Sequence, residues 1–484
     1  MRWLDIIAKW LDQRMKIAAP LREMMQHPVP RRSASWWYVF GSAALVLFGL
    51  QVITGILLAL VYAPTAGQAW NSLQVLDHSV TLGWFLRAMH GWGADFMVGV
   101  VLVHMTQVFL FGAYKYPREL TWMAGVFLLL LTLGMAFTGQ VLRFDQDAYW
   151  GLGIGAAIVG RVPGMGAALV HLMLGGPIIA GNTLSRFFDL HVFTLPAVLG
   201  GFVSLHLLLV LKLGINEWPM PGRLVRRETY LQEYEQLTHE NGAPFVPYAV
   251  WKDMLFAAAI VAAVAACAIV FGPFGPRGVP DPTLIQTAPR PDFFFLWLFA
   301  LLALLPPQME TPLLLIAPVV IIVGLLLLPF LAGEGEKSWR RRPVAVLSLT
   351  VIAVSLAALT HLAIVSPWSP AMDAWSSAPI PSAYLRGRSP LEFRGALVFQ
   401  EKQCRNCHSL AGVGGQRGPA LDSVATVLTE DQLIRQVIQG GGNMPAYGNN
   451  LTPAEVTALV AFLETLRPAG QLPAQNEALR KVGP

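Results

Sequence analysis

The sequence predicts an all-α protein in two parts, a polytopic membrane bundle of about seven helices and a small all-α soluble domain at its C-terminal end. Of the 484 residues, 55% are hydrophobic and only 13% are charged, which is outside the range of soluble globular domains. The composition changes beyond residue 367, where a Pro/Ser-rich linker precedes a tail of ordinary soluble character. The tail is therefore predicted to be a second domain.

Apolar stretches long enough to cross about 30 Å of hydrocarbon predict the spans. The segment 143–187 contains Gly, Pro and short apolar pieces, which favours surface-lying helices over a further span. The first 25 residues mix charges with apolar residues at helical spacing, which indicates an amphipathic helix on the membrane surface and no cleavable signal peptide. The seven predicted spans are 37–62, 88–113, 121–142, 188–212, 253–274, 312–332 and 344–366.

The Lys and Arg residues are concentrated in particular loops, so the net charge of +5 reflects topology and does not indicate nucleic-acid binding. The first loop, 63–83, has no Lys or Arg, whereas the 213–252 loop and the stretch 335–345 are rich in them. The positive-inside rule then predicts a cytoplasmic N-terminus. Seven spans place the C-terminal domain on the outer face of the membrane.

Four histidines fall inside two predicted spans, His90 and His104 in the second, His191 and His206 in the fourth. Along a helix, their spacing puts both histidines of each span on one face at two depths, about 21 Å apart. Since the two spans cross the membrane in the same sense, His90 pairs with His191 near the outer face and His104 with His206 near the inner face. Two imidazoles at one depth suit the axial positions of a haem iron, so two non-covalent, bis-histidine b haems are predicted.

Two pairs of glycines, Gly41 with Gly55 and Gly125 with Gly139, repeat in the first and third spans with the spacing of His90 and His104. Glycines of this kind also serve ordinary helix packing. The shared period favours two porphyrin planes against bare backbone. Pro196 is placed to bend the fourth span and absorb the extra residue between its histidines.

The C-terminal domain begins with a C-x-x-C-H motif, in which Cys404 and Cys407 would attach a haem covalently and His408 would bind its iron. The domain resembles class I cytochromes c over about residues 390–470. That resemblance implies that the Pro419 carbonyl orients the histidine and that Met444 is the distal ligand. The C-terminal helix is predicted at 451–466, behind a capping box at Thr452 and Glu455.

The remaining Cys and His residues have simpler interpretations. Cys267 lies alone in an apolar run and is interpreted as a small buried hydrophobe. Five histidines have no partner at ligand spacing, namely His27, His78, His171, His239 and His361.

The membrane part resembles the cytochrome b family of quinol:cytochrome c oxidoreductases, the cytochrome bc and bf complexes, over about residues 30–366. The stretches that carry the resemblance are "GLQVITG", "GWFLRAMHGW", "YPRELTWMAGV", "TGQVLRFDQDAYWG", "TLSRFFDLHVFTLP" and "LLPFLAGEGEKSWRRRPVAV". The spacing of His191 and His206 is similar to that of the chloroplast and Gram-positive branch. This chain, however, unites in one polypeptide what that branch usually splits in two.

The resemblance implies an outer quinol-oxidation pocket in which Asp292, within "RPDFFF", accepts a quinol proton, with Phe293 beside it. Tyr149 would line the opposite wall. Without the resemblance, Asp292 could equally cap a helix or pair in a loop. An Asp at this position, where a Glu is usual, is often seen in menaquinol-using relatives.

Three basic residues match positions near haem propionates or the inner quinone site. Arg87 and Arg118 are the propionate candidates, and Lys212 matches the inner quinone region; lipid-headgroup contact is the simpler reading of the arginines. Val39 stands where chloroplast-type relatives attach an extra haem through a cysteine. A covalent extra haem is therefore not expected here.

As a function, the resemblance implies the core subunit of a respiratory or photosynthetic quinol:cytochrome c oxidoreductase in a bacterial inner membrane, within a homodimeric complex. The chain lacks the Cys/His set of an iron-sulfur cluster, so a separate Rieske protein is expected, with the fused haem c as its acceptor and a further c-type cytochrome downstream. Quinone would be reduced at the inner face. Two alternatives remain open: a di-haem anchor relaying electrons for a separate dehydrogenase, and a haem-handling transporter.

The predicted organisation follows from these assignments. It comprises a surface helix (1–30), a four-helix haem-binding domain (31–215), a cytoplasmic loop (216–250), a three-helix domain (251–366), a linker (367–388) and a cytochrome c domain (389–484).

Overall fold

The computed structural model describes residues 2–16, 25–176, 179, 181–276, 278–280, 291–305, 307–365, 379–402, 404–414, 418–440, 444, 447–448 and 451–474. Within these ranges, 7 helices are long and apolar enough to cross a membrane, which confirms the predicted number. They are α3 (Phe40–Ala59), α5 (Gly83–Leu110), α6 (Glu119–Leu142), the continuous segment Gly181–Leu213, α13 (Val250–Phe271), Met309–Leu331 of α15 (Pro307–Leu331) and α16 (Pro343–Val365).

The chain forms two compact units. The first comprises Met1–Arg143, Phe187–Pro276 and Leu313–Ala358. The second comprises Phe144–Arg186, Arg277–Pro312 and Leu359–Pro484.

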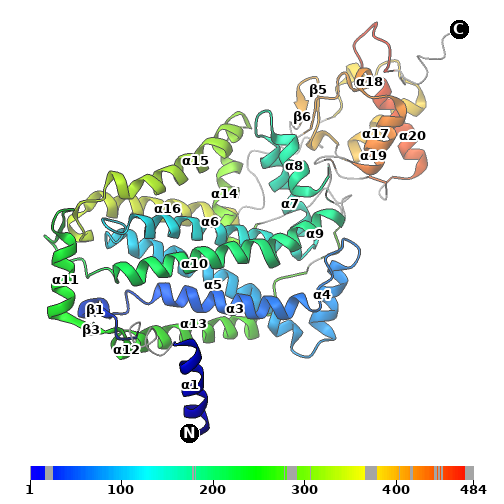
Figure 1. The fold of residues 1–484 in the computed structure, drawn as a ribbon. Helices are drawn as coiled ribbons and strands as arrows, with labels where there is room; N and C mark the ends of the chain where they lie inside the picture. Colours follow the sequence, from blue (N-terminus) through cyan, green and yellow to red (C-terminus); the bar gives the residue numbers. More distant parts are fainter. Residues whose placement is uncertain are drawn as a thin grey trace. The chain divides into compact units, whose positions relative to one another are not determined.

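In the first unit, long helices lie side by side (Figure 1). Helix α3 packs against α5, and α6 packs against α10 (Leu195–Leu213). Helix α13 covers α3 and α5. The contact layer of these helices is rich in small and aliphatic side chains, because small residues let backbones approach closely; its buried members include Ala43, Leu47, Ala88, Leu199, Val264 and Ala268.

Two short antiparallel pairs tie the loops of the first unit together. Strand β1 (Pro28–Pro30) pairs with β3 (Gly242–Pro244), and β2 (Leu224–Val225) pairs with β4 (Gly335–Glu336). Along the chain, α11 (Tyr230–Asn241) connects β2 to β3, and α12 (Phe245–Tyr248) follows β3. The second pair brings two loops that are distant in sequence into one polar cluster, described below.

Helix α1 (Arg2–Met15) has apolar side chains at the spacing of one helix face. Trp3, Ile6, Ile7 and Trp10 are all exposed, Trp3 by 79%. This is the amphipathic pattern expected of a surface helix.

In the second unit, the segment predicted to hold surface helices is helical. It contains α7 (Gln146–Gly160), α8 (Gly166–Leu174) and the start of α9 (Gly181–Asp189). Asp145 caps α7 by accepting a hydrogen bond from the Ala148 amide at 2.9 Å. A further apolar helix, α14 (Phe293–Leu304), begins directly after Asp292.

The C-terminal domain is built on the crossing of α17 (Pro390–Glu401) with α20 (Pro453–Glu464). Gly395 makes this contact possible, because a Cβ there would lie 1.9 Å from the Ala458 carbonyl oxygen. Thr452 and Glu455 form the predicted capping box at the start of α20, which confirms that prediction. Helices α18 (Val424–Val427) and α19 (Glu430–Gln439) and the hairpin of β5 (Ser409–Leu410) with β6 (Val413–Gly414) complete the domain.

Candidate functional site

The structure brings the four membrane histidines together in two pairs. His90 of α5 faces His191, with ring centroids 6.2 Å apart and ring planes at 79°. His104, on the same helix, lies close enough to His206 of α10 for electrostatic interaction. The helix period thus produces the depth pairing expected from the sequence.

Each histidine ring lies against one of the four glycines. A Cβ added at Gly139 would lie 2.7 Å from Cε1 of His191, and one at Gly55 would lie 3.2 Å from Cε1 of His90. A Cβ added at Gly41 would lie 3.3 Å from Cε1 of His104, and one at Gly125 would lie 3.6 Å from Cε1 of His206. Both helices that face the histidine helices therefore present bare backbone at the level of each ring.

The extra residue between His191 and His206 is absorbed by a π-helical turn. Residues Leu190–Thr194 form this turn, and the Leu195 amide bonds to the Leu190 carbonyl. A π turn widens a helix by one residue and is common at functional sites. Pro196 follows directly, and because it has no N–H it cannot continue the α-helical hydrogen-bond ladder back into the turn. The adjustment expected of Pro196 is thus made by the π turn just before it.

Two threonines contact the rings of the first pair. Thr54 Oγ1 lies 2.8 Å from His90 Nδ1, and Thr138 Oγ1 lies 3.0 Å from His191 Nδ1. Each threonine directly precedes a ring-facing glycine, Gly55 or Gly139. These contacts are not among the predictions made from the sequence, although the repeated Thr-Gly dipeptide is a visible signal.

The residues present fit two haem groups. The donors are imidazole nitrogens in facing pairs, and the backbone beside each ring lacks a Cβ that would fill the space. Among the described residues, the buried Nδ1 atom of His104 has no hydrogen-bond partner. Imidazoles held in such pairs between helices are typical ligands of a low-spin haem iron.

The predicted propionate residue Arg87 is engaged with protein groups. Its Nε and Nη2 donate to the two carboxylate oxygens of Asp77, at 2.8 and 2.5 Å. Asp77 lies on α4 (Ala69–His78). The guanidinium also donates to the carbonyls of Phe274 (2.7 Å) and Gly275. Arg87 therefore ties the start of α5 to the end of α4 and to the loop that follows α13.

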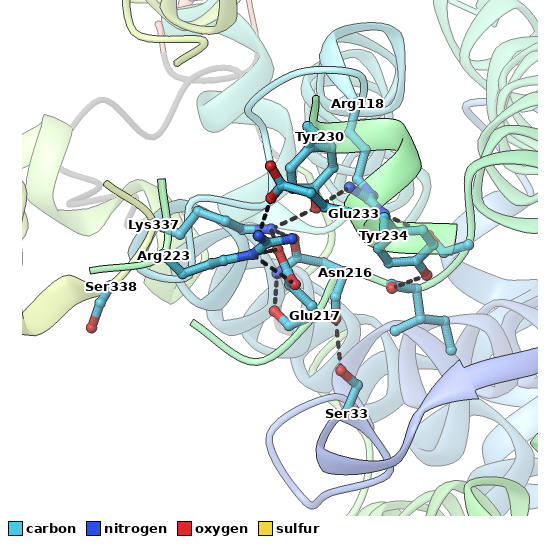
Figure 2. Close-up of polar contacts among 12 residues, drawn as sticks. Ser33, Arg118, Asn216, Glu217, Arg223, Tyr230, Glu233, Tyr234, Lys337 and Ser338 are labelled. Atoms are coloured by element: carbon cyan, nitrogen blue, oxygen red, sulfur yellow. Dashed lines mark hydrogen bonds and ion pairs between the residues drawn. The ribbon is translucent and has the colours of Figure 1, made fainter. Parts of the chain in front are cut away.

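Arg118 belongs to the polar cluster shown in Figure 2. Its Nη1 donates to the Tyr230 hydroxyl at 3.1 Å and its Nη2 to the Leu213 carbonyl at 3.1 Å. The guanidinium also lies over the Tyr234 ring, 5.1 Å from the centroid. Arg118 thus anchors the end of α10 to α11, whereas Lys212, one residue before Leu213, is exposed.

The centre of this cluster is Lys337, whose side chain is only 1% exposed. Its Nζ lies 2.6 Å from Asn216 Oδ1, 2.9 Å from the Tyr230 hydroxyl and 3.3 Å from Glu217 Oε1. Burial lowers the pKa of Lys337 to about 7, and the Glu217 carboxylate opposes that shift. Arg223 also donates to Glu217, at 3.2 Å. From the sequence alone this basic stretch indicates only topology, because the partners of Lys337 come from a loop that is distant in the chain.

The residues predicted for the quinol pocket all lie in the second unit. Asp292 occupies the N-cap position of α14 and is half-buried; Phe293 is exposed and Phe294 buried. Tyr149, on α7, is half-buried with its ring edge-on to Phe144 and Trp150. Burial raises the pKa of Tyr149, so its hydroxyl stays protonated.

In the C-terminal domain, His408 Nδ1 donates to the Pro419 carbonyl at 2.8 Å, as predicted. Burial lowers the pKa of His408, which keeps the imidazole neutral, the form that binds iron. A Cβ at Gly418 would lie 2.4 Å from His408 Cε1. Met444 is half-buried against the domain core, and its Sδ is 3.5 Å from Gln436 Nε2. These residues fit a covalently attached haem with the proximal histidine held in one orientation.

A multi-pass helical bundle with two facing histidine pairs, joined to a C-x-x-C-H domain, defines a membrane cytochrome with a fused c-type domain. A family model for cytochrome b/b6/petB matches residues 24–214, and one for subunit III of cbb3-type cytochrome c oxidase matches residues 393–463. The chain belongs to the cytochrome b/b6 family. As a member with a fused cytochrome c domain, it carries haem b and haem c.

Individual relatives agree with this assignment. Cytochrome b6 of Heliobacterium mobile is 40% identical over 209 residues, which is 43% of this chain and 98% of the relative. Cytochrome b of Rhodobacter capsulatus is 34% identical over 303 residues, 61% of this chain and 67% of the relative. Among solved structures, a chain of a hyperthermophilic respiratory Complex III aligns with a TM-score of 0.62 and 26% identity, covering 82% of this chain and 95% of that one.

Proposed function

We propose that this chain is the core electron-transfer subunit of a quinol:cytochrome c oxidoreductase in a bacterial inner membrane. The observation that carries the proposal is the combination of two glycine-backed histidine pairs at two depths with a C-x-x-C-H domain in the same polypeptide. Two haem-binding pairs on the same helices would provide two electron-transfer sites in series across the membrane. The similarity to a Complex III chain supports a multi-subunit assembly that includes the quinone pool.

The roles of the membrane residues follow from their positions. His90 with His191, and His104 with His206, would each hold one b haem, with Gly41, Gly55, Gly125 and Gly139 leaving room for the ring planes. Haems bound there would supply one-electron transfer without an open coordination position. Arg87 and Arg118 would brace the helix ends that carry the ligands, and a propionate contact would add to the partners each already has.

Asp292 would accept a proton from quinol at the outer face. Its place at the start of α14, with the aromatic Phe293 and Phe294 behind it, joins a carboxylate to an apolar wall that can hold a quinol ring. Tyr149 would line the same pocket with a protonated hydroxyl. At the inner face, the exposed Lys212 would bind the quinone that is reduced there.

The fused domain would receive electrons on the side where quinol is oxidised. Cys404 and Cys407 would form thioethers, with His408 and Met444 as axial ligands of the c haem. A separate Rieske protein would carry one electron from quinol to this domain, and a further c-type cytochrome would remove it. A homodimeric complex is part of the proposal.

The test measures quinol:cytochrome c reductase activity of the purified complex with three substitutions. Asp292→Asn removes the proton acceptor and should lower turnover by about a hundredfold or more, the contribution that general acid–base catalysis typically makes. Asp292→Glu should restore much of the activity, with a changed pH profile. Glu235→Gln, at an exposed acid on α11, is the control and should leave activity unchanged.

The same activity measurement distinguishes the proposed function from the main alternative, a di-haem anchor. A di-haem anchor for a separate dehydrogenase needs no outer quinol pocket, so its activity would not depend on Asp292. Unchanged turnover of Asp292→Asn would therefore refute the role proposed for this residue.

A further inference from the structure

The two histidine pairs differ in the groups that contact Nδ1. In the His90–His191 pair, each ring has a threonine hydroxyl at hydrogen-bond distance, Thr54 at 2.8 Å and Thr138 at 3.0 Å. His191 is also hydrogen-bonded to the backbone of Met135. In the His104–His206 pair, no threonine hydroxyl bonds to either ring among the described residues: the buried Nδ1 of His104 has no hydrogen-bond partner there, and His206 bonds to the backbone of Thr121. The residues before the glycines facing this second pair are Phe40 and Ala124, which carry no hydroxyl.

The direction of the threonine hydrogen bonds follows from counting protons. A threonine hydroxyl has a single proton to donate. Thr54 Oγ1 donates to the Leu50 carbonyl at 2.7 Å, and Thr138 Oγ1 donates to the Gly134 carbonyl at 2.9 Å. Each hydroxyl is therefore an acceptor toward its histidine.

This arrangement determines the tautomer of both rings. The acceptor at Nδ1 places the proton on that nitrogen, which leaves the Nε2 lone pair free to bind iron. An Nδ1–H that donates to an acceptor also makes the imidazole a stronger electron donor to its metal. A stronger donor stabilises the ferric state relative to the ferrous state and so lowers the reduction potential.

We propose that Thr54 and Thr138 are positioning residues that lower the reduction potential of the His90–His191 haem relative to the His104–His206 haem. The proposal rests on the proposed function, in which each pair holds a b haem. Electrons entering at the His90–His191 pair would then move downhill toward the His104–His206 pair. The direction of transfer would thus be set in part by two hydroxyl groups that belong to neither ligand helix.

The test uses Thr54→Val and Thr138→Val in the full complex, which remove the acceptor and keep the side-chain shape. Thr54→Ser and Thr138→Ser keep the hydroxyl. Thr132→Val is the matched control, because Thr132 lies buried on the same helix as Thr138 and bonds to the Leu128 carbonyl at 2.8 Å. Optical redox titration then follows the two b haems separately, and electron paramagnetic resonance reports the ligand orientation.

Each valine variant should raise the midpoint potential of the His90–His191 haem, and the double variant should raise it further. The midpoint potential of the His104–His206 haem should stay unchanged in every variant. In the serine variants and in Thr132→Val, the potentials of both b haems should equal those of the unmodified protein. Unchanged potentials in fully haem-loaded valine variants would overturn the proposal, as would an equal shift in Thr132→Val.

Loss of the haem from the valine variants alone, with retention in the serine and Thr132→Val variants, also supports the positioning role. Failure of the proposed function has a different signature. The unmodified protein would then lack two low-spin b haems, whatever the potentials.

Discussion

Gly139 and His191 make the closest of the four glycine–histidine contacts, since a Cβ at position 139 would lie 2.7 Å from the ring Cε1. At Gly125 the corresponding distance to His206 is 3.6 Å, an ordinary van der Waals contact. The four positions therefore form a graded series in which the same substitution meets different amounts of space.

Replacing each glycine by alanine should lower haem b content in the order of these clearances. Overpacking lowers stability by about 1–3 kcal/mol, whereas Gly→Ala in an unobstructed helix raises stability by about 0.5–1 kcal/mol. Gly139→Ala should therefore lose haem, Gly55→Ala and Gly41→Ala should lose part of it, and Gly125→Ala should bind normally. Haem-to-protein ratios from reduced-minus-oxidised spectra check this order, and equal effects at Gly139 and Gly125 would contradict it.

The buried Lys337 should make stability depend on pH. Burial lowers its pKa to about 7 in the folded protein, whereas the unfolded chain keeps the ordinary value near 10.4. Between these values the unfolded state binds more protons, so stability should rise with pH over about 7 to 10.

Melting temperatures across this range test the prediction by comparison with Lys337→Met, in which the Lys337 contribution is absent. The difference between the two proteins should shift in favour of the unmodified protein as pH rises. Glu217→Gln, which removes the carboxylate that opposes the shift, should extend the rise to lower pH. A difference that stays flat across the range would show that Lys337 does not titrate there.

Gly418→Ala should disturb the c-type domain through His408. The added Cβ would lie 2.4 Å from the ring Cε1, so the ring must move from the position in which Nδ1 bonds to Pro419. We expect a displaced proximal ligand, seen as a changed visible spectrum of the c haem, with the b haems unaffected. The control is Gly324→Ala on α15, at a helical glycine with no neighbour within 4 Å, and a spectrum that is normal in both variants would contradict the prediction.

The exposed apolar face of α1 should bind lipid. A peptide of residues 1–16 should gain helix content and show a blue-shifted tryptophan emission on vesicles containing phosphatidylglycerol, because Trp3 and Trp10 enter the interface. Ile6→Lys with Ile7→Lys should abolish both changes. Identical spectra with and without vesicles would show that this face has another role.

The sequence by itself determined the number of spans, the depth pairing of the histidines and the c-type motif. These features depend on hydropathy and on the period of a single helix, which local residues specify. The capping box at Thr452 and Glu455 is local in the same sense, since its partners are three residues apart.

Only the tertiary structure decided which groups meet across helices. The hydrogen bond of Thr138 with His191 and the burial of Lys337 beside Glu217 both join segments far apart in the chain. Lys337 is the clearest case, because a lysine in a charged loop is ordinarily solvated, and only the packing of the 213–252 loop removes it from water. The physical reason is that such contacts depend on how helices and loops pack, which no local pattern of residues specifies.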